Sequence, residues 1–273
     1  MTLQDSLSLG GPPRRVAIVT GGGRGLGREM ARSLVEAGAD VVLASRTLAQ
    51  LEDTAAFIER DTGRRPHIIP TDIQKSSECD ALIDQTVEKF GRLDIMMNNA
   101  GIGDRRGAGA RLWELTDEDW HDTIEVNLYG TFYCSRKAAS QFIAQGGGGK
   151  IINTASIAGK QGYEPLAHYS ASKFAVVALT QAAARAFGGN RINVNAICPG
   201  VTFTAILEDL LETRSKEQGI TVEDMRTRIE KPIPIGRGNT PADIGAMAVF
   251  LAGPGARNIT GQCYNVDGGL VPS

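Results

Sequence analysis

Short apolar runs alternate with stretches of helical periodicity along most of this chain. The runs lack polar alternation, as strands that are buried on both faces do. They lie at 15–20, 40–44, 67–70, 93–97, 150–154, 191–197 and 263–266. Helical periodicity fills the intervals at 26–37, 47–61, 76–90, 116–145, 167–187 and 243–251. Strand–helix alternation with short links predicts an α/β fold: one doubly wound parallel sheet of about seven strands with helices on both faces.

Two segments depart from this alternation. Residues 1–14 are polar and predict a flexible N-terminal tail, which leaves residues 15–273 as a single domain. Residues 202–234 are charged and mostly helical in pattern, and they interrupt the alternation before the last strand. An excursion of that length beyond the strand ends of an open sheet predicts a lid over a binding site.

Composition and charge exclude several classes of protein. The chain has 273 residues, 29 basic and 31 acidic, for a net charge of -2. That balance provides no cationic surface for nucleic acid or for anionic membranes. The four cysteines, Cys79, Cys134, Cys198 and Cys263, are too widely spaced for a disulfide framework or a metal site, so buried thiols and no metal are expected. No run approaches the ~18 apolar residues of a membrane span, and we expect a cytoplasmic protein.

A glycine-rich turn follows the first predicted strand and opens the first helix. Gly21, Gly25 and Gly27 have the spacing G-x-x-x-G-x-G within TGGGRGLG. Residues without side chains let backbone N–H groups approach a pyrophosphate at a helix N-terminus. The alternative is a tight structural turn with no ligand.

The end of the second predicted strand bears on the choice of cofactor. A carboxylate there would select the unphosphorylated ribose of NAD, but this chain has Ser45 and then Arg46. Arg46 offers a planar cation suited to a 2'-phosphate, and Arg24 in the glycine turn can reach the same group. The pattern favours NADP over NAD; the alternative is that both arginines are solvated turn residues.

Four further residues have the chemistry of a proton-transfer site. Tyr169 and Lys173 stand one helical turn apart, so the ammonium is expected to stabilise the phenolate and depress the tyrosine pKa. Ser156 follows the fifth strand, where its hydroxyl can donate to a substrate oxygen. Asn127 lies within a predicted helix, where asparagine is unfavourable. It is either a structural polar group that kinks the helix or the holder of an active-site water.

In register, these motifs resemble the short-chain dehydrogenase/reductase family, whose fold is of the Rossmann type. The resemblance rests on TGGGRGLG, Asp72, the run Asn98-Asn99-Ala100-Gly101, Asn127, Ser156, Tyr169-x-x-x-Lys173 and Cys198-Pro199-Gly200, and it extends from about Arg15 to Gly269. It implies that Tyr169 is the general acid or base, that Ser156 orients the carbonyl, that Lys173 binds the nicotinamide ribose and that Asn127 holds a water. It also implies that Asp72 holds the adenine amino group. The residues implied to bind the cofactor are Gly21, Gly23, Arg24, Gly25, Leu26, Gly27, Ser45, Arg46, Asp72, Ile73, Asn99, Ala100, Gly101, Tyr169, Lys173, Pro199, Gly200, Val201 and Thr204.

Substrate contacts are expected from the lid and from the loops around the site. Tyr163, Phe203, Ile206 and Leu207 are the predicted contacts. A further hypothesis gives Arg105, one of three arginines in the segment 102–113, an anionic substrate group; the alternative is that all three are solvated. His168 is next to Tyr169, but adjacent helical residues point in different directions, so an outward side chain is expected.

The resemblance implies an NADP-dependent oxidoreductase that transfers hydride reversibly between the nicotinamide and a ketone or secondary alcohol. The segment around Tyr169 is similar to acetoin, butanediol and sugar-alcohol dehydrogenases, which favours a small diketone, ketose or polyol. The alternatives are a 3-oxoacyl-[acyl-carrier-protein] reductase, a hydroxysteroid dehydrogenase, or a noncatalytic NADP-binding sensor or scaffold. Residues 174–187 are apolar on almost every face, which predicts a homodimer or homotetramer.

Overall fold

Seven parallel strands form one sheet in the computed structural model, which describes residues 8–11, 13–103 and 111–272. The spatial order of the strands is β3-β2-β1-β4-β5-β6-β7. The bounds are β1 (Val16–Thr20), β2 (Asp40–Ser45), β3 (His67–Pro70), β4 (Ile95–Asn98), β5 (Gly149–Thr154), β6 (Ile192–Pro199) and β7 (Cys263–Val266). The predicted doubly wound sheet is therefore confirmed. The strand order reverses between β1 and β4, where such folds bind their ligands.

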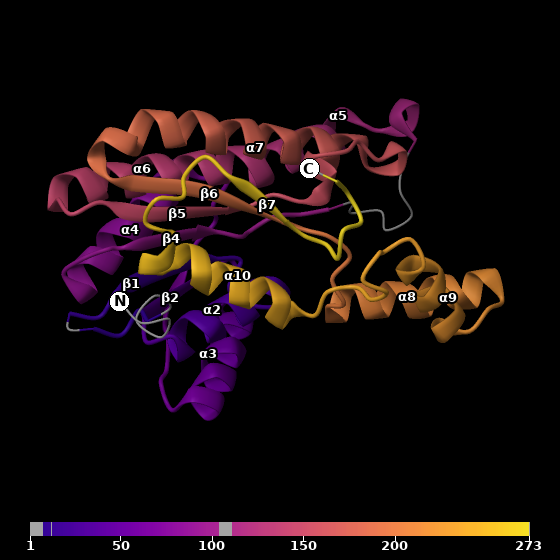
Figure 1. Cartoon of the computed structure of the whole chain (residues 1–273), viewed down its shortest axis with the longest axis horizontal. Helices are drawn as coiled ribbons and strands as arrows, with labels where there is room; N and C mark the ends of the chain where they lie inside the picture. Colours follow the sequence, from indigo (N-terminus) through magenta and orange to yellow (C-terminus); the bar gives the residue numbers. More distant parts are fainter. Residues whose placement is uncertain (1–7, 12, 104–110, 273) are drawn as a thin grey trace.

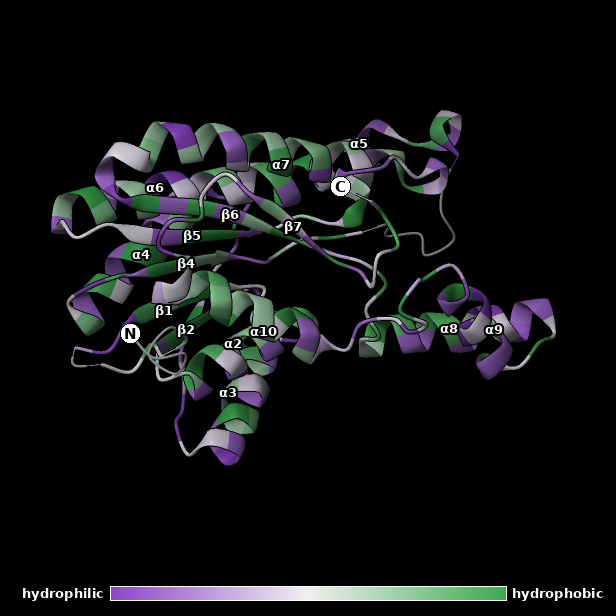
Figure 2. Ribbon diagram, viewed as in Figure 1, coloured by the Kyte–Doolittle hydropathy of each residue, from purple (hydrophilic) through white to green (hydrophobic). Residues whose placement is uncertain are grey.

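Helices cover both faces of the sheet (Figure 1). One layer contains α2 (Gly25–Glu36), α3 (Leu48–Thr62) and α10 (Pro241–Ala252). The other contains α4 (Ser76–Phe90), α6 (Gly130–Gln145) and α7 (Ala167–Phe187). In Figure 2 the strands between the two layers are mostly green, which places apolar residues along the middle of the molecule.

The core explains why the strands carry no polar alternation. Successive side chains of a strand point to opposite faces. Ala17 and Val19 of β1 pack into the cluster under α2 and α10, whereas Ile18 packs into the cluster under α4 and α6. Every residue of β1 is buried, so both faces of the strand must be apolar.

The expected helix at 116–145 is interrupted. The structure has α5 (Asp117–Ile124), then a π-helical turn at Glu125–Tyr129, and then α6. Asn127 lies inside this turn. A π turn inserts one extra residue into the helical ladder and is frequent at functional sites.

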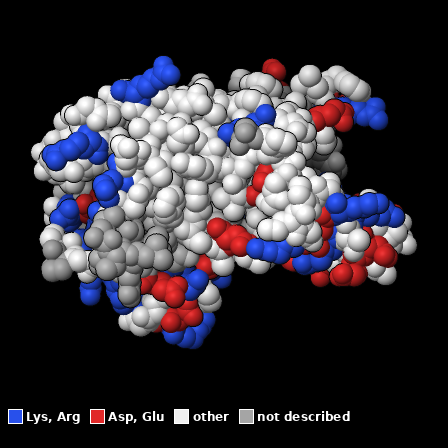
Figure 3. All heavy atoms as spheres, viewed as in Figure 1, with Lys and Arg blue, Asp and Glu red and all other residues white. Residues whose placement is uncertain are grey.

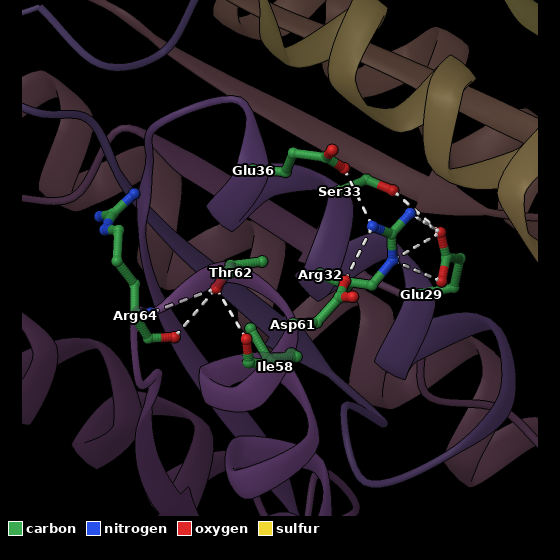
Figure 4. A network of polar contacts seen from close by, with 8 residues as sticks. All are labelled: Glu29, Arg32, Ser33, Glu36, Ile58, Asp61, Thr62 and Arg64. Carbon is green, nitrogen blue, oxygen red and sulfur yellow. Dashed lines mark hydrogen bonds and ion pairs between the residues drawn. The ribbon is translucent and has the colours of Figure 1, made fainter.

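Ion pairs join the first two helices that follow the glycine turn. Arg32 of α2 forms three hydrogen bonds from Nε and Nη2 to Glu29 and one of 2.9 Å to Glu36 (Figure 4). The same guanidinium reaches Asp61 of α3 at 3.2 Å. Each such surface pair contributes little, but the network fixes α2 against α3.

The excursion at 202–234 contains two helices, α8 (Ala205–Gln218) and α9 (Val222–Glu230). In Figure 1 they extend beyond one end of the sheet. The chain leaves the sheet at Thr202 and returns at Asn239, and these two residues form a parallel β-bridge. The excursion therefore begins and ends at a single point.

The described residues can be searched for membrane-spanning helices, metal-binding groups and disulfides, none of which the sequence predicts. No helix among them has both the length and the apolar character needed to cross a bilayer. Nor do they contain a group of three histidine, cysteine, aspartate or glutamate side chains placed to hold a metal ion. All four cysteines are free thiols, three of them buried and Cys263 half-buried. On the face in Figure 3, basic and acidic side chains adjoin one another in the lower part and over α8 and α9, whereas the left end carries mostly basic side chains.

Candidate active site

A cavity of about 510 Å³ opens at the carboxyl ends of the strands, beside the point where the strand order reverses. It is lined by residues of the glycine turn, of the ends of β2, β4, β5 and β6, and of α7. Its lining includes the predicted residues Gly21, Gly23, Arg24, Gly25, Leu26, Gly27, Ser45, Arg46, Asp72, Ile73, Asn99, Ala100, Gly101, Ser156, Tyr169, Lys173, Pro199, Gly200, Thr204 and Ile206. The structure thus gathers most of the predicted site in one place.

The glycine turn is packed so closely that side chains do not fit. A Cβ on Gly21 would lie 2.8 Å from the Cα of Ala100, and one on Gly27 would lie 2.2 Å from the carbonyl oxygen of Gly21. Gly21 also has a φ of +64°. The Thr20 hydroxyl accepts hydrogen bonds from the backbone N–H groups of Asn99 and Ala100, which ties this turn to the end of β4. The result is a bare backbone cradle in which α2 begins.

The part of the cavity between the glycine turn and the end of β2 carries cationic side chains and an unpaired polar group. The buried Oγ of Ser45 has no hydrogen-bond partner. Arg24 and Arg46 line the same region, and the only acidic side chain in the cavity lining formed by described residues is Asp72. A buried hydroxyl without a partner costs free energy unless a ligand satisfies it. This part of the cavity can therefore bind an anionic group that also accepts or donates a hydrogen bond.

Ser156, Tyr169 and Lys173 line the same cavity. Tyr169 and Lys173 stand one turn apart on α7, and the Lys173 Nζ lies 5.6 Å from the centroid of the Tyr169 ring. Ser156, just beyond β5, forms a hydrogen bond with Tyr169. Lys173 donates a hydrogen bond of 2.8 Å to the carbonyl oxygen of Thr154. A hydroxyl, a phenol and an ammonium are thereby brought to one point.

The pKa of Tyr169 is raised above 10 by burial, and its hydrogen bond with Ser156 only partly opposes this. The expected depression by Lys173 is therefore wrong for the protein alone. Burial lowers the pKa of Lys173 to about 8, and its nitrogen is directed to a backbone carbonyl. Desolvation penalises the charged forms of both groups. Tyr169 consequently keeps its proton at neutral pH, as a general acid must.

Asn127 is buried and does not line the cavity, and both polar atoms of its side chain form hydrogen bonds. Its Oδ1 accepts from the N–H of Ile102 at 2.8 Å, and its Nδ2 donates to the carbonyl of Ile102 and to Ser172. These bonds favour the structural alternative, since they hold the π turn against the loop that follows β4. The side chain nevertheless lies near Lys173: a Cβ on Gly101 would be 3.1 Å from Asn127 Oδ1 and 3.3 Å from Lys173 Nζ.

Several predicted positions are not where the sequence placed them. Tyr163, Val201, Phe203 and Leu207 do not line the cavity. Arg105 lies outside the described residues. His168 was expected to face outward but is only 2% exposed. Several elements besides the sheet, α5 among them, pack against α7, so a residue next to Tyr169 can be buried without facing the cavity.

Sequence reasoning missed Thr154 and Thr202. Thr154 supplies the acceptor for Lys173, and its own Oγ1 is buried without a partner. Thr202 lines the cavity at the start of the excursion. Thr154 could have been found by its place at the end of the fifth strand, since side chains there meet at one edge of the sheet. The acceptor role of its backbone carbonyl leaves no signal in the sequence.

Comparison with known proteins identifies the chain. A family model described as enoyl-(acyl carrier protein) reductase matches residues 21–271. A short-chain dehydrogenase/reductase from Armillaria gallica is 38% identical and aligns over 94% of this chain and 96% of its own length. The chain belongs to the short-chain dehydrogenase/reductase family. As a member of that family it is an oxidoreductase that uses a nicotinamide cofactor.

Other relatives of this short-chain dehydrogenase/reductase carry more specific names. It is 36% identical to a diacetyl reductase ((S)-acetoin forming) from Staphylococcus epidermidis, over 94% of this chain and 98% of the relative. A crystal structure of an actinorhodin polyketide ketoreductase variant with NADPH has a TM-score of 0.86 and 36% identity, and the match covers 99% of each chain.

Proposed function

We propose that this short-chain dehydrogenase/reductase is an NADP(H)-dependent reductase of small neutral ketones, of the diketone type, that also runs in reverse as an alcohol dehydrogenase. The observation that carries the cofactor preference is the unpartnered Ser45 hydroxyl beside Arg24 and Arg46. A guanidinium forms strong paired hydrogen bonds with a phosphate. The similar ketoreductase structure with NADPH supports the same choice.

The bare glycine turn and the strand ends fit the rest of the dinucleotide. Gly21 and Gly27 leave room for a pyrophosphate against the backbone at the start of α2, where the helix dipole favours an anion. Asp72 and Ile73 line the adenosine end, and Pro199, Gly200 and Thr204 line the opposite end. When bound, the reduced nicotinamide supplies a hydride for the carbonyl carbon.

The protein residues supply a proton and an environment for the developing alkoxide. In reduction, Tyr169 gives its proton to the carbonyl oxygen and Ser156 donates a hydrogen bond to the same oxygen. The raised pKa of Tyr169 keeps it protonated before this step. Lys173 holds a positive charge close to the phenolate that results, and the Thr154 carbonyl keeps that ammonium in place.

The lining around Ser156 and Tyr169 favours a neutral substrate. Ile102 and Ile206 line the same cavity as Ser156 and Tyr169. Its charged side chains among the described residues are Lys173 and the three that we assign to the adenosine end, Arg24, Arg46 and Asp72. An acidic sugar would need a paired cation, and a polyol would need several hydrogen-bond partners. A small diketone needs only the two donors that Ser156 and Tyr169 provide. The similarity to a diacetyl reductase agrees with this.

A larger ketone is the second candidate, and exposed apolar side chains favour it. Ile206 lines the cavity and is 54% exposed, so it can contact an apolar group that extends out of the site. The likeness to a polyketide ketoreductase supports the same alternative. Faster turnover of bicyclic or long-chain ketones than of diacetyl would establish this candidate over the first.

We also propose that the protein is a homodimer or homotetramer. Phe132 of α6 and Phe174 of α7 are 41% and 44% exposed on the outer helical layer. Exposed apolar side chains gathered on one layer are typical of a subunit interface. Figure 3 also shows a broad region without charged side chains near β7 and the adjoining part of α7.

The test is a turnover assay of the purified protein with NADPH and with NADH against diacetyl, ketoses, oxoacyl thioesters and steroids. We expect kcat/KM with diacetyl to be about 100-fold higher for NADPH than for NADH. NADH has no 2'-phosphate to bond the guanidinium, and the loss of that bond costs about 3 kcal/mol. Equal use of both cofactors would contradict the NADP assignment. Tight NADPH binding without turnover of any carbonyl would instead support a noncatalytic sensor.

A further inference from the structure

Phe203 lies in the short connection between β6 and α8, where α9 folds back over it. The guanidinium carbon of Arg226 in α9 is 3.9 Å from the centroid of the Phe203 ring. On another side the ring meets the segment that leads back to the sheet, because a Cβ on Gly238 would lie 2.5 Å from Phe203 Cε2. The ring is thus confined between α9 and the segment through which the excursion rejoins the sheet.

The same guanidinium also holds α8. Arg226 Nη2 lies 2.5 Å from Oε1 of Glu208, and the two side chains are 32% and 39% exposed. One arginine therefore links α8, α9 and the connection at Phe203. A planar guanidinium can stack on a ring while its edge bonds a carboxylate, which an ammonium cannot do equally well.

The connection that Arg226 holds is directly continuous with the cavity. The backbone N–H of Phe203 donates to the carbonyl of Asn239 at 2.9 Å, and that of Asn239 donates to the carbonyl of Val201 at 2.8 Å. The two neighbours of Phe203, Thr202 and Thr204, line the cavity. Movement of the Phe203 ring therefore displaces groups that face the ligand.

We propose that Arg226 is a positioning residue that keeps the α8–α9 excursion in the arrangement able to bind ligand. The inference rests on the proposed function, reduction of a ketone by NADP(H), and on the lid that the sequence predicts at residues 202–234. If only a fraction of the molecules has the lid in place, the apparent Kd equals the intrinsic Kd divided by that fraction. Loss of Arg226 then raises KM for the cofactor and for the ketone, while kcat does not fall, because Ser156, Tyr169 and Lys173 are untouched.

The test compares Arg226→Gln and Arg226→Lys with Arg228→Gln, which removes an exposed arginine from the same helix. We expect Arg226→Gln to raise both KM values about 3- to 10-fold, in keeping with one cation–π contact. Arg226→Lys should raise both KM values by a smaller factor, because lysine keeps the positive charge but cannot stack a planar group on the Phe203 ring. Arg228→Gln should match the wild type. Hydrogen exchange of residues 205–230 without ligand should become faster in Arg226→Gln alone.

Two results would overturn the proposal. One is that Arg226→Gln and Arg228→Gln have the same KM values and the same exchange rates. The other is a fall in Tm and kcat of Arg226→Gln with both KM values unchanged, which indicates a role in folding only. Failure of the proposed function is seen separately, because the wild type would then not bind or oxidise NADPH, whereas hydrogen exchange still reports whether Arg226 holds the excursion.

Discussion

The carbonyl oxygen of Thr154 accepts a 2.8 Å hydrogen bond from the ammonium of Lys173. This bond fixes the ammonium at the end of β5, 5.6 Å from the Tyr169 ring centroid. Gly101 faces the same nitrogen from the end of β4 and leaves space for it. The position of Lys173 is therefore set by backbone groups of two neighbouring strands.

Replacement of Gly101 by alanine should disturb this arrangement. The new Cβ would lie 3.3 Å from Lys173 Nζ and 3.1 Å from Asn127 Oδ1, so both groups must shift. We expect kcat to fall about 10- to 100-fold, as small misplacements of reacting groups do. Steady-state kinetics with NADPH and diacetyl give the measurement. Gly162→Ala is the matched control, because a Cβ there meets nothing within 4 Å.

Tyr169→Phe should remove the proton donor and leave the cavity otherwise intact. The expected loss in kcat is about 100- to 10,000-fold, the usual contribution of a general acid. NADPH binding, followed by fluorescence titration, should persist. Tyr163→Phe should keep a kcat close to that of the wild type, because Tyr163 does not line the cavity. A comparable loss in both variants would argue against Tyr169 as the proton donor.

Arg46→Ala should weaken NADPH binding selectively. Loss of a charge-assisted pair with a 2'-phosphate costs about 1.5–3 kcal/mol, or roughly 10- to 100-fold in KM for NADPH. The KM for NADH in the same variant is the internal control and should stay constant. An equal change for both cofactors would show that Arg46 does not read the 2' position.

The buried Lys150 should make stability depend on pH. Its Nζ bonds Asn193 and the carbonyl of Ala256, and it is 7% exposed. Burial lowers its pKa from 10.5 to about 8. Between these values the unfolded chain binds the proton and the folded chain does not, so stability relative to Lys150→Met rises with pH in that window. Below about pH 8 the buried ammonium imposes its full cost.

Urea denaturation of wild type and Lys150→Met at about pH 7 and about pH 10 measures the effect. The difference in free energy of unfolding should move in favour of the wild type by roughly 2–3 kcal/mol as the pH rises. Lys216→Met, on the exposed side of α8, is the control and should show no such trend. The same difference at both pH values for Lys150→Met would refute the prediction.

Charge placed on the outer helical layer should separate the subunits. Phe132→Glu and Phe174→Glu put a carboxylate on the proposed interface, where an unpaired charge cannot be buried. Analytical ultracentrifugation should show monomers for these variants and dimers or tetramers for the wild type. A monomeric wild type would remove the basis for the interface.

Local patterns predicted what depends on local geometry. The alternation of apolar runs and helical periodicity was enough to predict the parallel sheet. Strands buried on both faces are continuously apolar, whereas helices with one buried face repeat apolar residues every three to four positions. Tyr169 and Lys173 could be paired because residues one turn apart share a face of α7. The glycine turn was recognisable because Gly21 and Gly27 have no room for a side chain.

Contacts between distant segments could not be predicted in this way. His168 lies on α7, against which α5 and other elements pack, and the guanidinium of Arg226 in α9 lies over the ring of Phe203. Within the interruption at Glu125–Tyr129, Asn127 bonds to Ile102, a contact between separate segments that no helical periodicity reveals. The pKa of Tyr169 depends on whether burial outweighs the nearby ammonium, and that balance is a matter of distances.

The β-bridge between Thr202 and Asn239 closes the base of the excursion. A closed base makes the intervening helices an exchangeable module, because their length and sequence can vary without changing the register of any strand. Grafting α8 and α9 from another reductase between these two residues would be a direct route to new substrate selectivity on an unaltered catalytic frame.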